Sequence, residues 1–308
     1  MKLSDYVASF LAKQNIKKVF CLTGGCVVHL IDSIAKNKNI DYIPVLHEQS
    51  GAMAADCYSR VSENIGAVIA TSGPGATNLL TGICCSYYDS IPVIAITGQV
   101  PTGQLKRKSK SRQIGFQETD VVGIFKPVTK YAKLIDKPEI IRYELEKALY
   151  LAKTGRPGPV LLDICDDIQR ADINPQKLKS FNPELNKKLP KDLFKNEIDT
   201  IYSLLNKSSR PVLVLGHGFR LSGSISLAKK LIDTLQIPFL LTWGALDYIS
   251  HDHKLFAGTF GVTSGRNGNF TVQNADLILC IGTRLDTHEV GSNIKTFAPS
   301  SSNPFAVS

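Results

Sequence analysis

The sequence predicts an α/β protein made of two doubly wound parallel-sheet domains, and three observations support this. Short runs rich in β-branched residues alternate with stretches of helical periodicity, as expected when helices connect parallel strands. The runs are hydrophobic almost throughout, which is typical of strands buried on both faces of a sheet. The alternation stops at residues 169–192, which are rich in lysine and proline, and then resumes. We therefore predict a first domain at 1–168, a linker at 169–192 and a second domain at 193–308.

The expected elements follow from these patterns in chain order. Residues 1–18 predict an amphipathic first helix, and apolar positions at a spacing of three to four predict further helices at 139–153 and around 222–236. Strands of both domains are expected at residues 17–23, 40–46, 66–72, 91–98, 159–165, 211–218, 238–244 and 275–286. No strand pattern follows the sequence KTFAP near residue 299, so we expect the second domain to be incomplete, with its last sheet edge unpaired.

The composition excludes several classes of protein. The chain has 308 residues with a formal net charge of +9, and it contains no apolar run long enough to cross a membrane. Its first residues lack the pattern of a secretory signal, so we expect a cytoplasmic protein without a membrane partner. The positive charge is scattered except for KRKSKSR at 106–112, and no nucleic-acid-binding module accompanies it. We expect no nucleic-acid partner; such charge suits small carboxylates and phosphorylated cofactors.

Cysteine and histidine usage predicts no metal centre. The seven cysteines form no C-x-x-C pair and lie mostly in apolar runs, which indicates buried reduced thiols. His251, Asp252 and His253 stand in a polar connection without a third ligand, so a solvated loop is the favoured interpretation.

Two motifs stand where strands are expected to end. Glu48 follows a β-branched run and opens a helix rich in small residues, so it is either a helix-capping acid or a proton relay to a bound heterocycle. The sequence TSGPGATN at 71–78 allows a ligand to approach the backbone closely. It is not a dinucleotide-binding fingerprint, because Asn78 occupies the third glycine position.

Many segments together resemble one enzyme family. They include LHEQSGAMAADCYSR, ATSGPGATNLLTGI, YYDSIPVIAITGQVP, IGFQETDVVG, KPVTKYAKLI and GRPGPVLLDICDDIQ, and further on RPVLVLGHG, IPFLLTWGALDYI and GTRLD. In this order they resemble the thiamine-diphosphate-dependent decarboxylases and carboligases, and within them the acetolactate synthase group. The resemblance implies a pyrimidine-binding first domain and a truncated, flavin-associated central domain. The diphosphate-binding domain of the family would then be absent.

The resemblance also implies roles for individual residues. Glu48 would hydrogen-bond the pyrimidine ring of thiamine diphosphate, while Phe116 and Gln117 would reach into the active site; core packing is the alternative for Phe116. The implied contacts of thiamine diphosphate are Gly24, Gly25, Glu48, Gly73, Pro74, Gly75, Asn78 and Gln117. The implied contacts of FAD are Ser90, Arg156, Gly218, Thr242, Trp243, Gly258, Thr259, Phe260, Gly261, Gly282, Thr283, Arg284, Leu285 and Asp286.

The activity implied by the resemblance is decarboxylation of pyruvate and transfer of the two-carbon unit to a second 2-oxo acid, as in branched-chain amino acid biosynthesis. Thr23 stands where the group usually has proline, as in paralogues associated with surface polysaccharides, so transfer to a nucleotide-sugar ketone is an alternative. The family's Gly-Asp-Gly metal motif does not occur in the sequence. We therefore expect the Mg²⁺ ligands in the missing domain, supplied by a homo-oligomer or a companion chain. A non-catalytic fragment is the remaining alternative.

Overall fold

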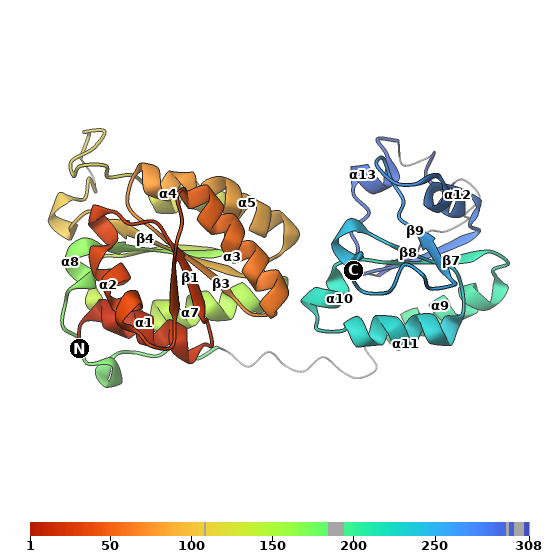
Figure 1. Cartoon of the computed structure of the whole chain (residues 1–308), viewed down its shortest axis with the longest axis horizontal. Helices are drawn as coiled ribbons and strands as arrows, with labels where there is room; N and C mark the ends of the chain where they lie inside the picture. Colours follow the sequence, from red (N-terminus) through yellow and green to blue (C-terminus); the bar gives the residue numbers. More distant parts are fainter. Residues whose placement is uncertain (108, 184–193, 294–295, 299–304, 308) are drawn as a thin grey trace. The chain divides into compact units, whose positions relative to one another are not determined.

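The structure is a computed structural model that describes residues 1–107, 109–183, 194–293, 296–298 and 305–307 (Figure 1). The chain divides into two compact units, Met1–Asn186 and Lys187–Ser308. Each unit contains one parallel sheet with helices between successive strands, so the α/β prediction is confirmed. Among the described residues, no helix is both long enough and apolar enough to cross a membrane.

The sheet of the first unit has six parallel strands in the order β2-β1-β3-β4-β6-β5. The strands are β1 (Lys18–Cys21), β2 (Asp41–Pro44), β3 (Gly66–Ala70), β4 (Val93–Gln99), β5 (Tyr131–Ile135) and β6 (Val160–Cys165). Every residue of the central strands β3, β4 and β6 is buried, in agreement with their continuous apolar sequences. The edge strand β5 was not predicted, because its half-buried residues interrupt the apolar pattern.

Helices cover both faces of this sheet. They are α1 (Leu3–Lys13), α2 (Val28–Lys36), α3 (Glu48–Ser62), α4 (Pro74–Asn78), α5 (Leu80–Asp89), α6 (Val121–Phe125), α7 (Ile141–Lys153) and α8 (Asp166–Gln169). Ala67 and Ile69 of β3 belong to one core with the apolar residues of α1, α2 and α7. Val68, which points to the other face, lies against Gly51 of α3. This alternation makes the first unit doubly wound.

Part of the segment predicted as a linker packs on the first unit. Lys2 and Asp172 form an antiparallel bridge, and the Ile173 N–H donates to the Met1 carbonyl at 2.9 Å. The side chain of Ile173 is buried, and the ring of Phe181 lies 5.4 Å from that of Tyr143 between centroids. A segment without periodicity is thus held in place by single anchoring side chains.

The second unit has a five-stranded parallel sheet in the order β11-β10-β7-β8-β9. Its strands are β7 (Pro211–Leu215), β8 (Phe239–Leu241), β9 (Phe256–Gly258), β10 (Leu277–Ile281) and β11 (Phe305–Val307). Its helices are α9 (Lys195–Lys207), α10 (Gly218–Leu221), α11 (Ile225–Leu235), α12 (Arg266–Asn274) and α13 (Thr287–Val290). Leu213 and Leu215 of β7 pack with α11, whereas Val212 and Val214 pack with α12, so this sheet is also covered on both faces.

Two expectations from the sequence are wrong. A strand does follow KTFAP: β11 pairs in parallel with β10, with Leu279 opposite Phe305, so β10 is not a bare edge. A strand of three residues is too short to produce a readable apolar pattern. The cysteines are all free, but Cys57 and Cys85 are exposed rather than buried, because they lie on the outer faces of α3 and α5.

Candidate functional site

The candidate site of the first unit lies at the carboxyl edge of its sheet, where the strand order reverses. The chain passes from β1 to β2 on one side, while β3 and β4 continue on the other. The loops that follow β1 and β3 meet at this edge, which is the usual place for a ligand in an open α/β sheet. Gly24 and Gly25 lie in the first loop, and Gly73 to Gly75 lie in the second.

Glu48 opens α3 next to the second of these loops. Its side chain is 7% exposed, and the Asn78 amide donates a hydrogen bond to its Oε2 at 2.9 Å. The helix-capping role is filled by His47, whose Nδ1 accepts from the Gln49 N–H at 3.1 Å. The capping interpretation of Glu48 is therefore unnecessary, although its charge still suits the positive end of the helix.

Glycines allow close packing around Glu48 and Thr71. A Cβ atom on Gly75 would lie 3.3 Å from Glu48 Oε1 and 2.6 Å from Thr71 Cγ2. A Cβ atom on Gly24 would lie 2.4 Å from Thr71 Cβ, closer than side chains can approach. Thr71 also accepts a hydrogen bond from the Cys26 N–H at 3.2 Å. The motif at 71–78 includes Thr71, but the sequence does not show these contacts, because they come from a loop distant in the chain.

The loop at 113–118 reaches the same place. A Cβ atom on Gly73 would lie 2.7 Å from the Gln117 carbonyl oxygen, so the two backbones are in direct contact. Gln117 has φ +60°, a left-handed conformation that is unusual for a residue with a side chain. Phe116 is 82% exposed, so core packing is wrong for this residue. The loop thus presents an exposed ring and an amide beside the glycine turn.

The remaining expected residues of the first unit form a separate pair. Arg156 Nε donates to Ser90 Oγ at 2.6 Å, and Ser90 is buried at the end of α5. The structure therefore joins Ser90 and Arg156 to each other, while the other residues expected to contact FAD lie in the second unit.

In the second unit, glycines meet where the strand order reverses between β7 and β10. A Cβ atom on Gly218 would lie 2.6 Å from Gly282 Cα, and the Gly218 N–H donates to the Gly282 carbonyl at 2.8 Å. Leu285 has φ +52°, and Asp286 caps α13 by accepting from the His288 and Glu289 N–H groups. Arg284 Nη2 lies 3.4 Å from Asp286 Oδ2. Several expected ligand contacts thus already serve the local fold.

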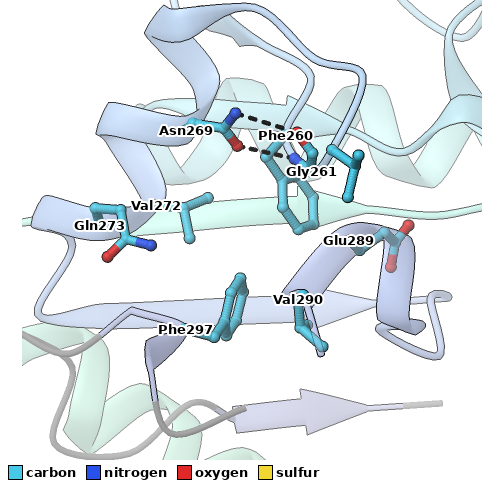
Figure 2. A pocket seen from close by; sticks show the side chains of 10 residues that line it. Phe260, Gly261, Asn269, Val272, Gln273, Glu289, Val290 and Phe297 are labelled. Atoms are coloured by element: carbon cyan, nitrogen blue, oxygen red, sulfur yellow. Dashed lines mark hydrogen bonds between the residues drawn. The ribbon is translucent and has the colours of Figure 1, made fainter. Parts of the chain in front are cut away.

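A cavity of about 200 Å³ opens next to this loop (Figure 2). Phe260 and Gly261, both expected to contact FAD, are among its lining residues. Asn269 fixes Gly261 by two hydrogen bonds, accepting from its N–H at 2.8 Å and donating to its carbonyl at 3.1 Å. Burial raises the pKa of Glu289, another lining residue. Sequence reasoning missed Asn269 and Glu289, since no motif marks them.

The other expected residues surround this region without lining the cavity. Trp243 is half exposed and its ring centroid lies 6.1 Å from that of His288. Thr242 is buried, and Gly258 has φ +106°, which favours glycine. Within the described residues, no group of three or more His, Cys, Asp or Glu side chains could hold a metal ion.

Comparison with known proteins places both units in one family. A family model described as "Thiamine pyrophosphate enzyme, N-terminal TPP binding domain" matches residues 1–124, which include the Glu48 site. A second, described as "Thiamine pyrophosphate enzyme, central domain", matches residues 198–304.

Curated relatives match nearly the whole chain. The probable acetolactate synthase large subunit of Methanocaldococcus jannaschii is 35% identical over 301 residues, which is 97% of this chain and 50% of that protein. The large subunit of acetolactate synthase isozyme 3 of Escherichia coli is 32% identical, over 96% of this chain and 50% of that protein. The mitochondrial acetolactate synthase catalytic subunit of Saccharomyces cerevisiae is 33% identical, over 94% of this chain and 42% of that protein. The chain thus spans about half the length of the curated relatives it matches.

Proposed function

Because this chain belongs to the thiamine pyrophosphate enzyme family, we propose that it is the pyrimidine-binding and central part of an acetolactate synthase-like carboligase. The complete enzyme decarboxylates pyruvate and transfers the two-carbon unit to a second 2-oxo acid. One observation carries this proposal: the buried Glu48 carboxylate, oriented by Asn78, lies beside a glycine turn at the sheet's switch point.

These residues fit the pyrimidine end of thiamine pyrophosphate. When bound, this cofactor supplies an electron sink for the decarboxylation of 2-oxo acids. Glu48 holds or receives a proton at a ring nitrogen, and the Asn78 amide keeps the carboxylate in one orientation. Gly73 and Gly75 allow the ring to approach the backbone. Gln117 offers its amide to a substrate oxygen on which negative charge develops.

We assign the diphosphate and Mg²⁺ to a partner subunit, because these 308 residues contain no Gly-Asp-Gly motif. The relatives are about twice as long as this chain, and several are named large subunits. An exposed face near Glu48 supports such a partner. On α3 and the residues just before it, exposed Leu46, Met53 and Cys57 are uncharged, and Tyr88 on α5 is 59% exposed. An apolar surface of this kind is typical of an interface.

FAD is the second cofactor of the proposed enzyme. The cavity beside Phe260 and Gly261 supports it, but at about 200 Å³ it would take only part of so large a molecule. In the first unit, Arg156 carries a guanidinium group of the kind that binds a diphosphate, and with Ser90 it is a separate candidate contact.

Glu48→Gln tests the proposed function in an assembly that contains this chain with a diphosphate-binding partner. We expect acetolactate formation from pyruvate to fall by about 10² or more, because the amide cannot exchange a proton. The melting temperature should stay unchanged. Glu63→Gln, the same substitution at the other end of α3, is the matched control and should retain full activity.

Two outcomes would redirect the proposal. Undiminished acetolactate formation by the Glu48→Gln assembly would remove Glu48 from the proton transfer. A wild-type assembly that forms no acetolactate, but consumes pyruvate when given a nucleotide-sugar ketone, would favour the polysaccharide alternative. That alternative is supported by the Thr23-Gly24-Gly25 sequence after β1.

A further inference from the structure

A second cavity of about 440 Å³ lies in the first unit, beside the carboxyl ends of β4 and β6. Gln99 and Asp163 contribute buried polar groups to its lining. Apolar lining comes from residues that include Leu105, Val122 and Leu134. The volume is in the range of sites for small organic molecules.

Every carboxylate that lines this cavity already has a partner. Asp163 accepts from the Thr97 hydroxyl at 2.7 Å and from the Gln99 amide at 2.9 Å. The other three carboxylates also have partners. Glu118 accepts hydrogen bonds from the backbone N–H groups of Lys106 and Ile114. Asp120 accepts one from the backbone N–H of Gly123, and Asp136 forms an ion pair with Arg107. Their acceptor atoms are therefore satisfied within the protein, and Arg107 offsets the charge of Asp136.

Two cationic groups that line the cavity have no such partner. The Lys106 ammonium and the Arg112 guanidinium make no hydrogen bond or ion pair with any described residue. Lys106 is half-buried, whereas Arg112 is exposed. Guanidinium and ammonium groups bind carboxylate and phosphate through short, charge-assisted hydrogen bonds. The donors that lack a partner in this cavity are therefore those of an anion site, and apolar side chains stand beside them.

We propose that this cavity binds a small organic anion, whose phosphate or carboxylate group contacts Lys106 and Arg112 and whose apolar body lies against Leu105, Val122 and Leu134. The site is distinct from the Glu48 site. Both nevertheless use the segment from Leu105 to Val122, which Glu118 ties together by accepting from the Ile114 N–H at 3.0 Å. A bound anion would restrict this segment and with it the Gln117 backbone that touches Gly73.

The test is calorimetric titration of the purified chain with four probes at low ionic strength. Inorganic phosphate and acetate report the charged part of the site, whereas phenyl phosphate and benzoate add an apolar body. We expect the phenyl compounds to bind more tightly than the corresponding plain anions, because their rings bury apolar surface. Comparing phenyl phosphate with benzoate identifies which anionic group the site prefers.

Variants separate this site from general attraction to a basic loop. Arg112→Gln and Lys106→Gln should each weaken phenyl phosphate binding by about tenfold, the loss expected for a charge-assisted hydrogen bond. Lys110→Gln is the matched control, since Lys110 is an exposed lysine of the same loop that does not line the cavity. Val122→Trp should fill the cavity and abolish the advantage of the phenyl ring.

The proposal is overturned if Lys110→Gln weakens binding as much as Arg112→Gln, or if the phenyl ring brings no gain. It is also overturned if no probe binds at millimolar concentration. Glu48→Gln should leave phenyl phosphate binding unchanged, so a failure of the proposed enzymatic function and a failure of this site are distinguishable.

Discussion

Asp163 lies at the centre of β6 with its carboxylate fully enclosed. Burial raises its pKa from 3.8 to about 7, against the opposing effect of the hydrogen bonds from Thr97 and Gln99. In the unfolded chain the carboxyl group ionises near its ordinary pKa. Between these two values the folded protein holds a proton that the unfolded chain has released.

Asp163→Asn should therefore change how stability depends on pH. For the wild type, this group stabilises the fold fully below pH 3.8, and that contribution is lost as pH rises toward about 7. The difference corresponds to about 4 kcal/mol at most. Urea unfolding at pH 4.5 and pH 8 should show a smaller fall in unfolding free energy for the variant. Parallel pH dependences for the two proteins would show that Asp163 does not titrate in this range.

At the same scale, the sequence could predict Glu48 and the glycines because they form a contiguous pattern after a strand. The structure places Glu48, Gly75 and Gln117 around one turn, and their roles in catalysis stay predictions. Asn269 and the contacts of Thr71 with the loop after β1 could not be found in this way. Their importance arises from contacts between loops, which a linear pattern does not encode.

Among the secondary-structure elements, the packing of α3 against α5 depends on one small residue, Gly82. Gly82 of α5 faces Ala52 of α3 so closely that a Cβ atom on Gly82 would lie 2.5 Å from the Ala52 Cβ. The Met53 backbone nitrogen would be 3.1 Å away. Any larger residue must therefore push the two helices apart.

Gly82→Ala is expected to lower the unfolding free energy by about 1–3 kcal/mol through overpacking. Alanine normally favours a helix over glycine, so the direction of the change is informative. Thr81→Ala, one position earlier on the exposed side of α5, is the control and should change stability by only a few tenths of a kcal/mol. Urea unfolding of both variants measures the difference. Equal stability of Gly82→Ala and the wild type would mean that α5 can shift at no cost.

The strands that were not predicted from the sequence escaped prediction for a common physical reason. β5 carries half-buried residues at the edge of its sheet, while β9 and β11 are three residues each. Long buried strands such as β4 can be predicted from their continuous apolar sequence. Short edge strands are defined by the backbone of their neighbour, and this information lies elsewhere in the chain.

At the level of the whole molecule, the first unit closes on itself by joining its beginning to residues 171–173. The Leu3 N–H donates to the Ala171 carbonyl, and Ile173 is buried in the main core with Leu3. Phe181 adds contacts with Tyr143 and Tyr150 of α7. These residues lie beyond the boundary that periodicity suggested.

Two shortened chains test this closure. A chain of residues 1–183 should unfold cooperatively, whereas a chain of residues 1–168 should be less stable by about 3 kcal/mol, since it cannot bury Ile173 and Phe181. Urea unfolding followed by circular dichroism measures both. Identical midpoints would mean that the segment after residue 168 only lies on the surface.

The shortness of the outermost strands has a consequence for how the chain behaves at high concentration. The outer strands of the two sheets are β2, β5, β9 and β11, and none of them exceeds five residues. Cross-β assembly requires matching segments of about six or seven residues. Pro44, at the end of β2, also lacks an N–H group for such pairing. The described sheets therefore offer poor templates for fibril growth when the chain is folded and concentrated.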